Sequence, residues 1–120
     1  MSEDKIIDPE AIEALRSLSP DGGGEFVREL IDMYLQDTPQ RLTEMDQALS
    51  AKDAPTFARA AHTIKGSSSN FGANRLSKVA QALEHQGKAG DLSQSAPLCA
   101  ALKAEYHLVV QALTAIAKGA

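Results

Sequence analysis

The chain has 120 residues, a net charge of −4, and 43% apolar residues without tryptophan. This length suits one domain with its own core, and a core of aliphatic side chains favours helices over sheets. The acidic balance excludes a nucleic-acid partner, and the longest uncharged apolar run, 108–117, is too short for a membrane span of about 20 residues. A single cysteine, Cys99, excludes an internal disulfide, and with no signal peptide we expect a soluble, cytoplasmic protein in which Cys99 serves in packing.

The first part of the chain predicts a short helix and then a glycine-rich loop. After a flexible lead-in over 1–7, Asp8 and Pro9 form a typical helix start, and the helix should run to about Leu18. Three successive glycines within 19–24 break it. The loop lacks the Gly-Lys-Ser/Thr ending of a phosphate-binding loop and has acidic neighbours, so it is predicted to be a linker.

The longest predicted helix runs from Glu25 to about Ala51, where apolar residues recur at helical spacing. Pro39 interrupts this spacing and must either kink the helix or split it. We expect a kink, because the apolar spacing resumes at Leu42 without a loop-like stretch.

The second half predicts three more helices. The first begins after the turn at 52–55 and frays near Asn70. The second spans about 74–86, and the segment from Gly87 to Gly90 ends it. The last begins after Pro97 and runs to about Lys118. Helices joined by so few residues must be antiparallel neighbours. The sequence therefore predicts an all-α fold over residues 8–120: an antiparallel four-helix bundle with a short extra N-terminal helix over one end.

One histidine is the centre of the predicted site. On a helical wheel of about 100° per residue, the apolar stripe of the 54–70 helix includes Phe57, Ile64 and Ser68, and His62 lies well away from it. A lone histidine on a helix is most often a simple surface residue. The residues that share its side change this interpretation.

These neighbours are basic, small or hydroxylated. Gly66 follows His62 by one turn, where a side chain would crowd the ring, and a glycine inside a helix costs about 1 kcal/mol relative to alanine. Lys65 can swing its ammonium group toward a group on the same imidazole, and Arg59 and Ser69 lie on the same side. The set predicts a histidine that carries or meets a phosphoryl group, with Gly66 as steric clearance.

At these residues the chain resembles a known family. The sequence HTIKGSS at 62–68, followed by an apolar residue and Gly72-Ala73, resembles the phosphorylation motif of histidine-containing phosphotransfer (HPt) domains, most closely over 58–83. The resemblance implies that His62 accepts the phosphoryl group and that Lys65 and Gly66 assist it. Ser69 and Arg59 are our additional candidates for stabilising the phosphoryl group.

The resemblance also implies partners and a reaction. His62 would take a phosphoryl group from the aspartate of a receiver domain and pass it to another receiver in a two-component pathway. The receiver would bring Mg²⁺, so we expect this chain to bind no cofactor or metal. We find no nucleotide-binding or kinase motif, expect a monomer that does not phosphorylate itself from ATP, and keep open a non-catalytic helical adaptor that docks partners through the His62 face.

Glu84 is the predicted orienting residue. An antiparallel pair of helices that turns at Phe71-Gly72 brings residues 62 and 84 to similar heights, so the carboxylate can accept a hydrogen bond from Nδ1 of His62. HPt domains often have a glutamine near the ring, so a glutamate is a mild departure. The alternative is a solvated Glu84 that pairs with Lys88 at i+4.

A metal-dependent enzyme is disfavoured by spacing. A di-metal bundle needs Glu-x-x-His pairs, whereas Glu84 and His85 are adjacent and Glu105 and His107 are two apart. We expect His85 and His107 to be exposed or at helix ends.

Overall fold

The computed structural model describes residues 5–119, and these contain five helices and no strand. In chain order they are α1 (Pro9–Arg16), α2 (Gly24–Ala51), α3 (Ala54–Ser69), α4 (Asn74–Lys88) and α5 (Ser95–Gly119). The predicted all-α fold is confirmed.

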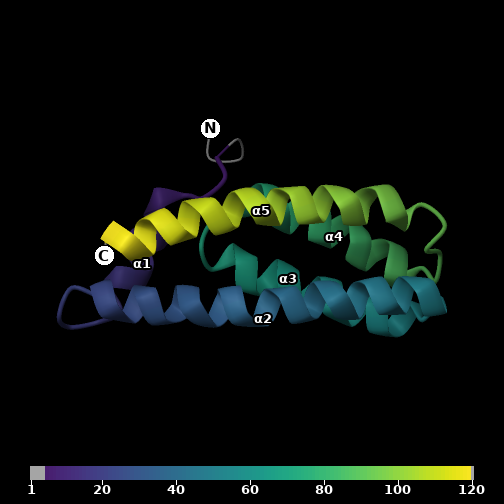
Figure 1. Ribbon diagram of the computed structural model, residues 1–120, viewed down its shortest axis with the longest axis horizontal. Coiled ribbons are helices and arrows are strands. Elements are labelled where there is room, and N and C mark those ends of the chain that lie inside the picture. The colour runs from purple at the N-terminus through teal and green to yellow at the C-terminus, as the bar shows by residue number, and fades with distance from the viewer. Residues whose placement is uncertain (1–4, 120) are drawn as a thin grey trace.

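The four longer helices form an antiparallel bundle, and the molecule measures 47 × 28 × 21 Å (Figure 1). Around the bundle α2 packs on α3, α3 on α4, α4 on α5, and α5 on α2. The long helices α2 and α5 run along opposite edges in Figure 1, and α1 lies at the end of the bundle where α5 finishes. The backbone N–H of Asp8 donates to the carbonyl oxygen of Gly72 at 3.1 Å, which ties α1 to the α3–α4 turn. The predicted place of the first helix is confirmed.

The helix starts agree with their sequence signals. Asp8 Oδ1 accepts from the backbone N–H of Glu10 at 3.0 Å, and Asp53 Oδ1 accepts from that of Thr56 at 3.3 Å. Each aspartate precedes a proline in the first turn, where the missing N–H would have had no helical partner. The end of α1 lies at Arg16, two residues before the predicted Leu18.

Pro39 lies inside an uninterrupted helix. α2 continues through it from Gly24 to Ala51, so one helix, and not two, lies between the glycine-rich loop and α3. Pro39 is on the solvent side, and its neighbour Thr38 is buried. Water can therefore satisfy the carbonyl group that the proline leaves without a donor.

α4 ends within the 87–90 segment predicted to end it, two residues beyond the predicted bound of 86. The helix continues through Gly87 to Lys88 and turns at Gly90, which has a positive φ of 72°. Gly87 is buried, and a Cβ atom there would lie 2.8 Å from the Cβ of Ala58 on α3. This glycine therefore permits a close approach of two helices. The last helix also starts earlier than predicted, at Ser95, because Pro97 is accommodated within its first turn.

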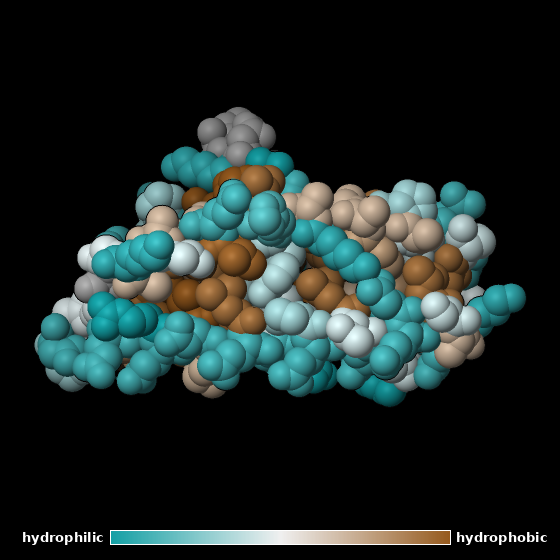
Figure 2. Space-filling view, in the orientation of Figure 1, coloured by the Kyte–Doolittle hydropathy of each residue, from teal (hydrophilic) through white to brown (hydrophobic). Residues whose placement is uncertain are grey.

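The core is aliphatic, with a small aromatic cluster. The predicted stripe of α3, including Phe57, Ile64 and Ser68, is buried. Tyr34 stacks obliquely on Phe71, with ring centroids 5.2 Å apart, and on Tyr106, and its hydroxyl group hydrogen-bonds to Ser68 Oγ at 2.7 Å. Burial raises the pKa of Tyr34 to about 12. On the face seen in Figure 2, apolar surface gathers along the middle and α2 presents a hydrophilic edge.

The N-terminal segment and Cys99 both contribute to the core. Of the lead-in predicted over 1–7, residues 1–4 lie outside the described part, whereas Ile6 and Ile7 pack against the core. Cys99 is buried, in agreement with a packing role. Among the helices of residues 5–119, none combines the length and the apolar character that a bilayer crossing requires.

Candidate functional site

His62 lies in the middle of α3 with its side chain 66% exposed. The helix puts its apolar stripe into the core, so the opposite side, which carries His62, faces solvent. The imidazole is therefore accessible to another molecule.

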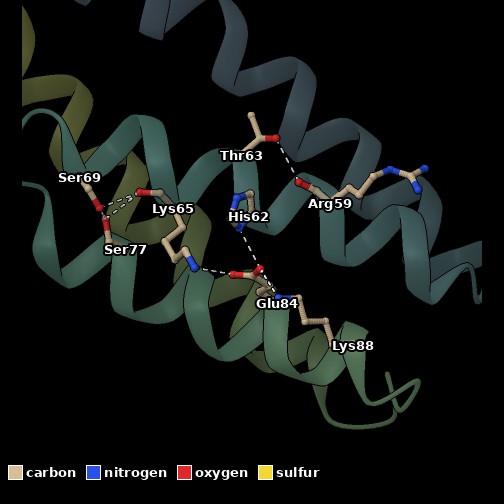
Figure 3. Close-up of polar contacts among 8 residues, drawn as sticks. All are labelled: Arg59, His62, Thr63, Lys65, Ser69, Ser77, Glu84 and Lys88. Atoms are coloured by element: carbon tan, nitrogen blue, oxygen red, sulfur yellow. Dashed lines mark hydrogen bonds and ion pairs between the residues drawn. The ribbon is translucent and has the colours of Figure 1, made fainter.

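Glu84 on α4 faces the ring and lies between it and the side chains of Lys65 and Lys88 (Figure 3). Its side chain is 2% exposed, and its Oε2 lies 2.9 Å from Nδ1 of His62. The contact predicted from the antiparallel pairing is present. A carboxylate only accepts hydrogen bonds, so Nδ1 must be the donor, and in the neutral ring the lone pair then lies on Nε2.

Glu84 is ionised because cations surround it. Lys65 Nζ lies 2.7 Å from Oε1, and Lys88 Nζ lies 3.0 Å from Oε2. The hydrogen bond from Lys65 is the largest cause that lowers the pKa of Glu84 to about 2; burial opposes it, and the bonds from Lys88 and His62 lower it further. The ring contact and the Lys88 pair, which the sequence presented as alternatives, therefore occur together.

Lys65 does not have a free ammonium group in this structure. The sequence placed it beside His62, and it is there, but its Nζ is bound to Glu84 and its side chain is 29% exposed. To pair as closely with a phosphoryl group on His62, the ammonium group of Lys65 would have to move away from the carboxylate.

Gly66 is on the exposed surface of α3. Apart from its chain neighbours and the nearby backbone of α3, no atom of residues 5–119 lies within 4 Å of a Cβ placed at Gly66. It borders a shallow polar hollow with Lys65, Ser69 and Ser77. The space beside Gly66 is open to a partner.

Ser69 has local partners. Its hydroxyl group lies 2.8 Å from the carbonyl oxygen of Lys65 and 3.0 Å from Ser77 Oγ. Sequence reasoning missed Ser77, because its position on α4 gives no sign that it meets α3. Any contact of Ser69 with a phosphoryl group requires its hydroxyl group to turn.

Arg59 is one turn before His62 and lines a second shallow hollow with His62, Thr63, Glu84 and Lys88. Its Nη2 donates to Thr56 Oγ1 at 3.3 Å, and in Figure 3 its guanidinium group points away from Glu84. The structure therefore does not bring Arg59 to the ring.

The other histidines are on the surfaces of α4 and α5. His85 and His107 are both exposed, and Nε2 of His107 lies 3.3 Å from the side-chain amide of Gln111. Within residues 5–119, no cluster of three or more His, Cys, Asp or Glu residues is placed to hold a metal ion.

The chain is similar in sequence to proteins that are named for phosphorelay or histidine phosphotransfer. Phosphorelay intermediate protein rdeA of Dictyostelium discoideum is 31% identical over 94 residues, which cover 78% of this chain and 37% of that protein. Multistep phosphorelay regulator 1 of Schizosaccharomyces pombe is 24% identical over 87 residues, covering 72% and 30%. Histidine-containing phosphotransfer protein 2 of Arabidopsis thaliana is 32% identical over 65 residues, covering 52% and 42%. The match thus spans less than half the length of each relative.

A solved structure matches the whole fold. The crystal structure of histidine-containing phosphotransfer protein B (HptB) from Pseudomonas aeruginosa PAO1 superposes with a TM-score of 0.88 over 98% of each chain, at 26% identity. The model of the Hpt domain family matches residues 29–112, a range that contains His62, Lys65, Gly66 and Glu84. Because this range is most of the chain, the protein belongs to the Hpt domain family.

Proposed function

We propose that this chain is a phosphorelay intermediate, in which His62 receives a phosphoryl group from a receiver-domain aspartate and passes it to another receiver domain. The observation that carries the proposal is the exposed His62 ring, whose Nδ1 is held by a buried carboxylate at 2.9 Å, so that Nε2 is left for attack. Membership of the Hpt domain family supports the same reaction.

The chemical step uses few groups of this chain. The Nε2 lone pair attacks the phosphorus atom, the bond between phosphorus and the aspartyl oxygen breaks, and the aspartate leaves as a carboxylate. The ring gains positive charge while Nδ1 keeps its proton, and Glu84 faces that charge. The transferred group brings a charge of about −2, which Lys65 would offset after it leaves Glu84. Ser69 and Arg59 would contribute less, since each must first leave a local partner.

The partner would supply the rest of the chemistry. Phosphoryl transfer depends mainly on positioning and electrostatics, and a receiver domain would bring the acidic pocket and Mg²⁺. We include in the proposal that the chain is a cytoplasmic monomer that does not use ATP. Gly66 would leave space for the receiver at the ring.

The test is His62→Gln, assayed with receiver domains that carry a radiolabelled phosphoryl group. We expect labelling to be lost while helicity and melting temperature stay nearly unchanged, because His62 is exposed and Lys65 and Lys88 still pair with Glu84. NMR of the phosphorylated protein should place the phosphoryl group on Nε2.

Three outcomes would contradict parts of this proposal. Label retained by the His62→Gln protein would exclude His62 as the acceptor. A product on Nδ1 would exclude the orienting role of Glu84. A wild-type chain that binds phosphorylated receivers and takes no label would be a docking adaptor instead.

A further inference from the structure

Lys65 has competing demands. Its ammonium group lies 2.7 Å from Glu84 Oε1, and the same group is expected to pair with the phosphoryl group on His62. Glu84 is 2% exposed, and a buried carboxylate that loses a partner is destabilised strongly. The movement of Lys65 therefore leaves the charge of Glu84 to its other partners, the Nδ1–H of His62 and the ammonium group of Lys88.

Lys88 is placed for this purpose. Its Nζ lies 3.0 Å from Oε2, whereas Lys65 occupies the other carboxylate oxygen. Glu84 and Lys88 are i and i+4 on α4, with the glutamate nearer the N-terminus, which is the favourable order for such a pair. The Lys88 side chain is 66% exposed, so its ammonium group keeps much of its hydration while it serves the carboxylate.

The two lysines that pair with Glu84 are on different helices. Lys65 and His62 are both on α3, so Lys65 can follow a group attached to the ring. Lys88 and Glu84 are both on α4, so their pair persists when Lys65 moves. Arg59 is not an equivalent cation, because it binds Thr56 and points away from Glu84 (Figure 3).

We propose that Lys88 is a positioning residue, which holds the charge of Glu84 while Lys65 passes from Glu84 to the phosphoryl group on His62. The inference rests on the proposed function and adds no covalent step to it. Before transfer both lysines pair with Glu84. After transfer Lys65 pairs with the phosphoryl group, while Lys88 and the Nδ1–H of His62 remain on Glu84.

The test compares Lys88→Met in two backgrounds, wild type and Glu84→Gln. Labelling is measured with a phosphorylated receiver and with phosphoramidate, a small phosphoryl donor that needs no receiver docking. We expect Lys88→Met to slow labelling by either donor about fivefold, and Lys88→Arg to restore it. In the Glu84→Gln background, where no buried charge needs a cation, Lys88→Met should change the rate less than twofold.

A matched control removes the same charge elsewhere. Lys103 pairs with Asp46 at 2.7 Å between α5 and α2, away from the ring, so Lys103→Met should leave labelling unchanged. Melting temperatures of all variants separate loss of folding from loss of transfer.

Each outcome decides between specific explanations. A normal rate for Lys88→Met in a wild-type background overturns the role of Lys88 and leaves the proposed function intact. Equal slowing in both backgrounds means that Lys88 acts on the phosphoryl group directly, which also overturns the inference. A wild-type chain that neither donor labels overturns the proposed function, and this inference with it.

Discussion

Two glycines flank the histidine site, and they differ in what surrounds them. Gly66 on α3 is exposed. Outside its own stretch of helix, no atom of residues 5–119 lies within 4 Å of a Cβ placed on it. Gly87 on α4 is buried, and the corresponding Cβ would lie 2.8 Å from Ala58 Cβ and 2.9 Å from the backbone nitrogen of Ala58. Each glycine costs its helix about 1 kcal/mol relative to alanine. Gly66 leaves open space on the surface of the bundle, whereas the space beside Gly87 is filled by the neighbouring helix α3.

Gly87 lies close to the contact between His62 and Glu84. Ala58 is one turn before His62 on α3, and Gly87 is one turn after Glu84 on α4. The close approach of the helices at Gly87 thus lies beside the 2.9 Å contact between His62 and Glu84. We call the exposed Gly66 side the open side, where the proposed function places the partner, and the Gly87 side the closed side, where the helices meet near the ring-to-carboxylate contact.

The largest effect is expected at the closed side. Gly87→Leu would put a side chain against the backbone of Ala58, so the helices must separate or the backbone must shift. We expect the free energy of unfolding to fall by about 3 kcal/mol and phosphoryl transfer to be nearly lost. Urea unfolding and a labelling assay measure the two effects, with Gly87→Ala as a smaller step in the same direction. Unchanged stability would show that the helices do not approach closely at this position.

Gly66→Leu should separate function from stability. The new side chain enters open space near the ring, so we expect transfer to slow about tenfold while the helix gains up to about 0.8 kcal/mol from the better propensity of leucine. Labelling rates and thermal melting measure this, and Gly66→Ala, which adds a single methyl group, is the control. Normal transfer together with lower stability would mean that Gly66 serves packing, as Gly87 does.

A smaller effect concerns acid stability at the closed side. The folded-state pKa of Glu84, about 2, is below the ordinary value of 4.5, so its stabilisation is present above pH 4.5 and is lost as the pH falls toward 2. We expect wild type to lose on the order of 1 kcal/mol more than Glu84→Gln across this window, because solvent screens the partly exposed lysines. Urea unfolding at a series of pH values measures the difference. Parallel stability curves would show that the charge of Glu84 contributes nothing to folding.

Features of the fold that depend on residues close together in the chain were predictable from the sequence. Helix starts at Asp8 and Asp53 were predictable because a cap and its first turn are adjacent in the chain. The buried stripe of α3 was predictable because a helix repeats its faces regularly. The packing role of Gly87 did not follow from the sequence, because a helix end and a close helix contact both favour glycine, and the difference depends on Ala58, 29 positions earlier.

The same limit applies to the site. The side of α3 that carries His62, Lys65 and Gly66 follows from their spacing on one helix. The partners of Glu84 did not follow in full, because a carboxylate has two oxygens and the sequence does not say how many donors reach them. Lys65 was placed correctly beside the ring, but its ion pair with Glu84 depends on how deeply α4 buries that carboxylate.

The cluster of Tyr34, Phe71 and Tyr106 has a spectroscopic consequence. The chain has no tryptophan and two tyrosines, both in this cluster, so its tyrosine signal in near-ultraviolet circular dichroism depends on the packing of α2 against α5 and the α3–α4 turn. The hydrogen bond from Tyr34 to Ser68 links that signal to the buried face of α3, on the opposite side from His62. The intrinsic optical signal of the native state therefore reports the interior of the bundle, and chemistry at the imidazole can proceed without a chromophore beside it.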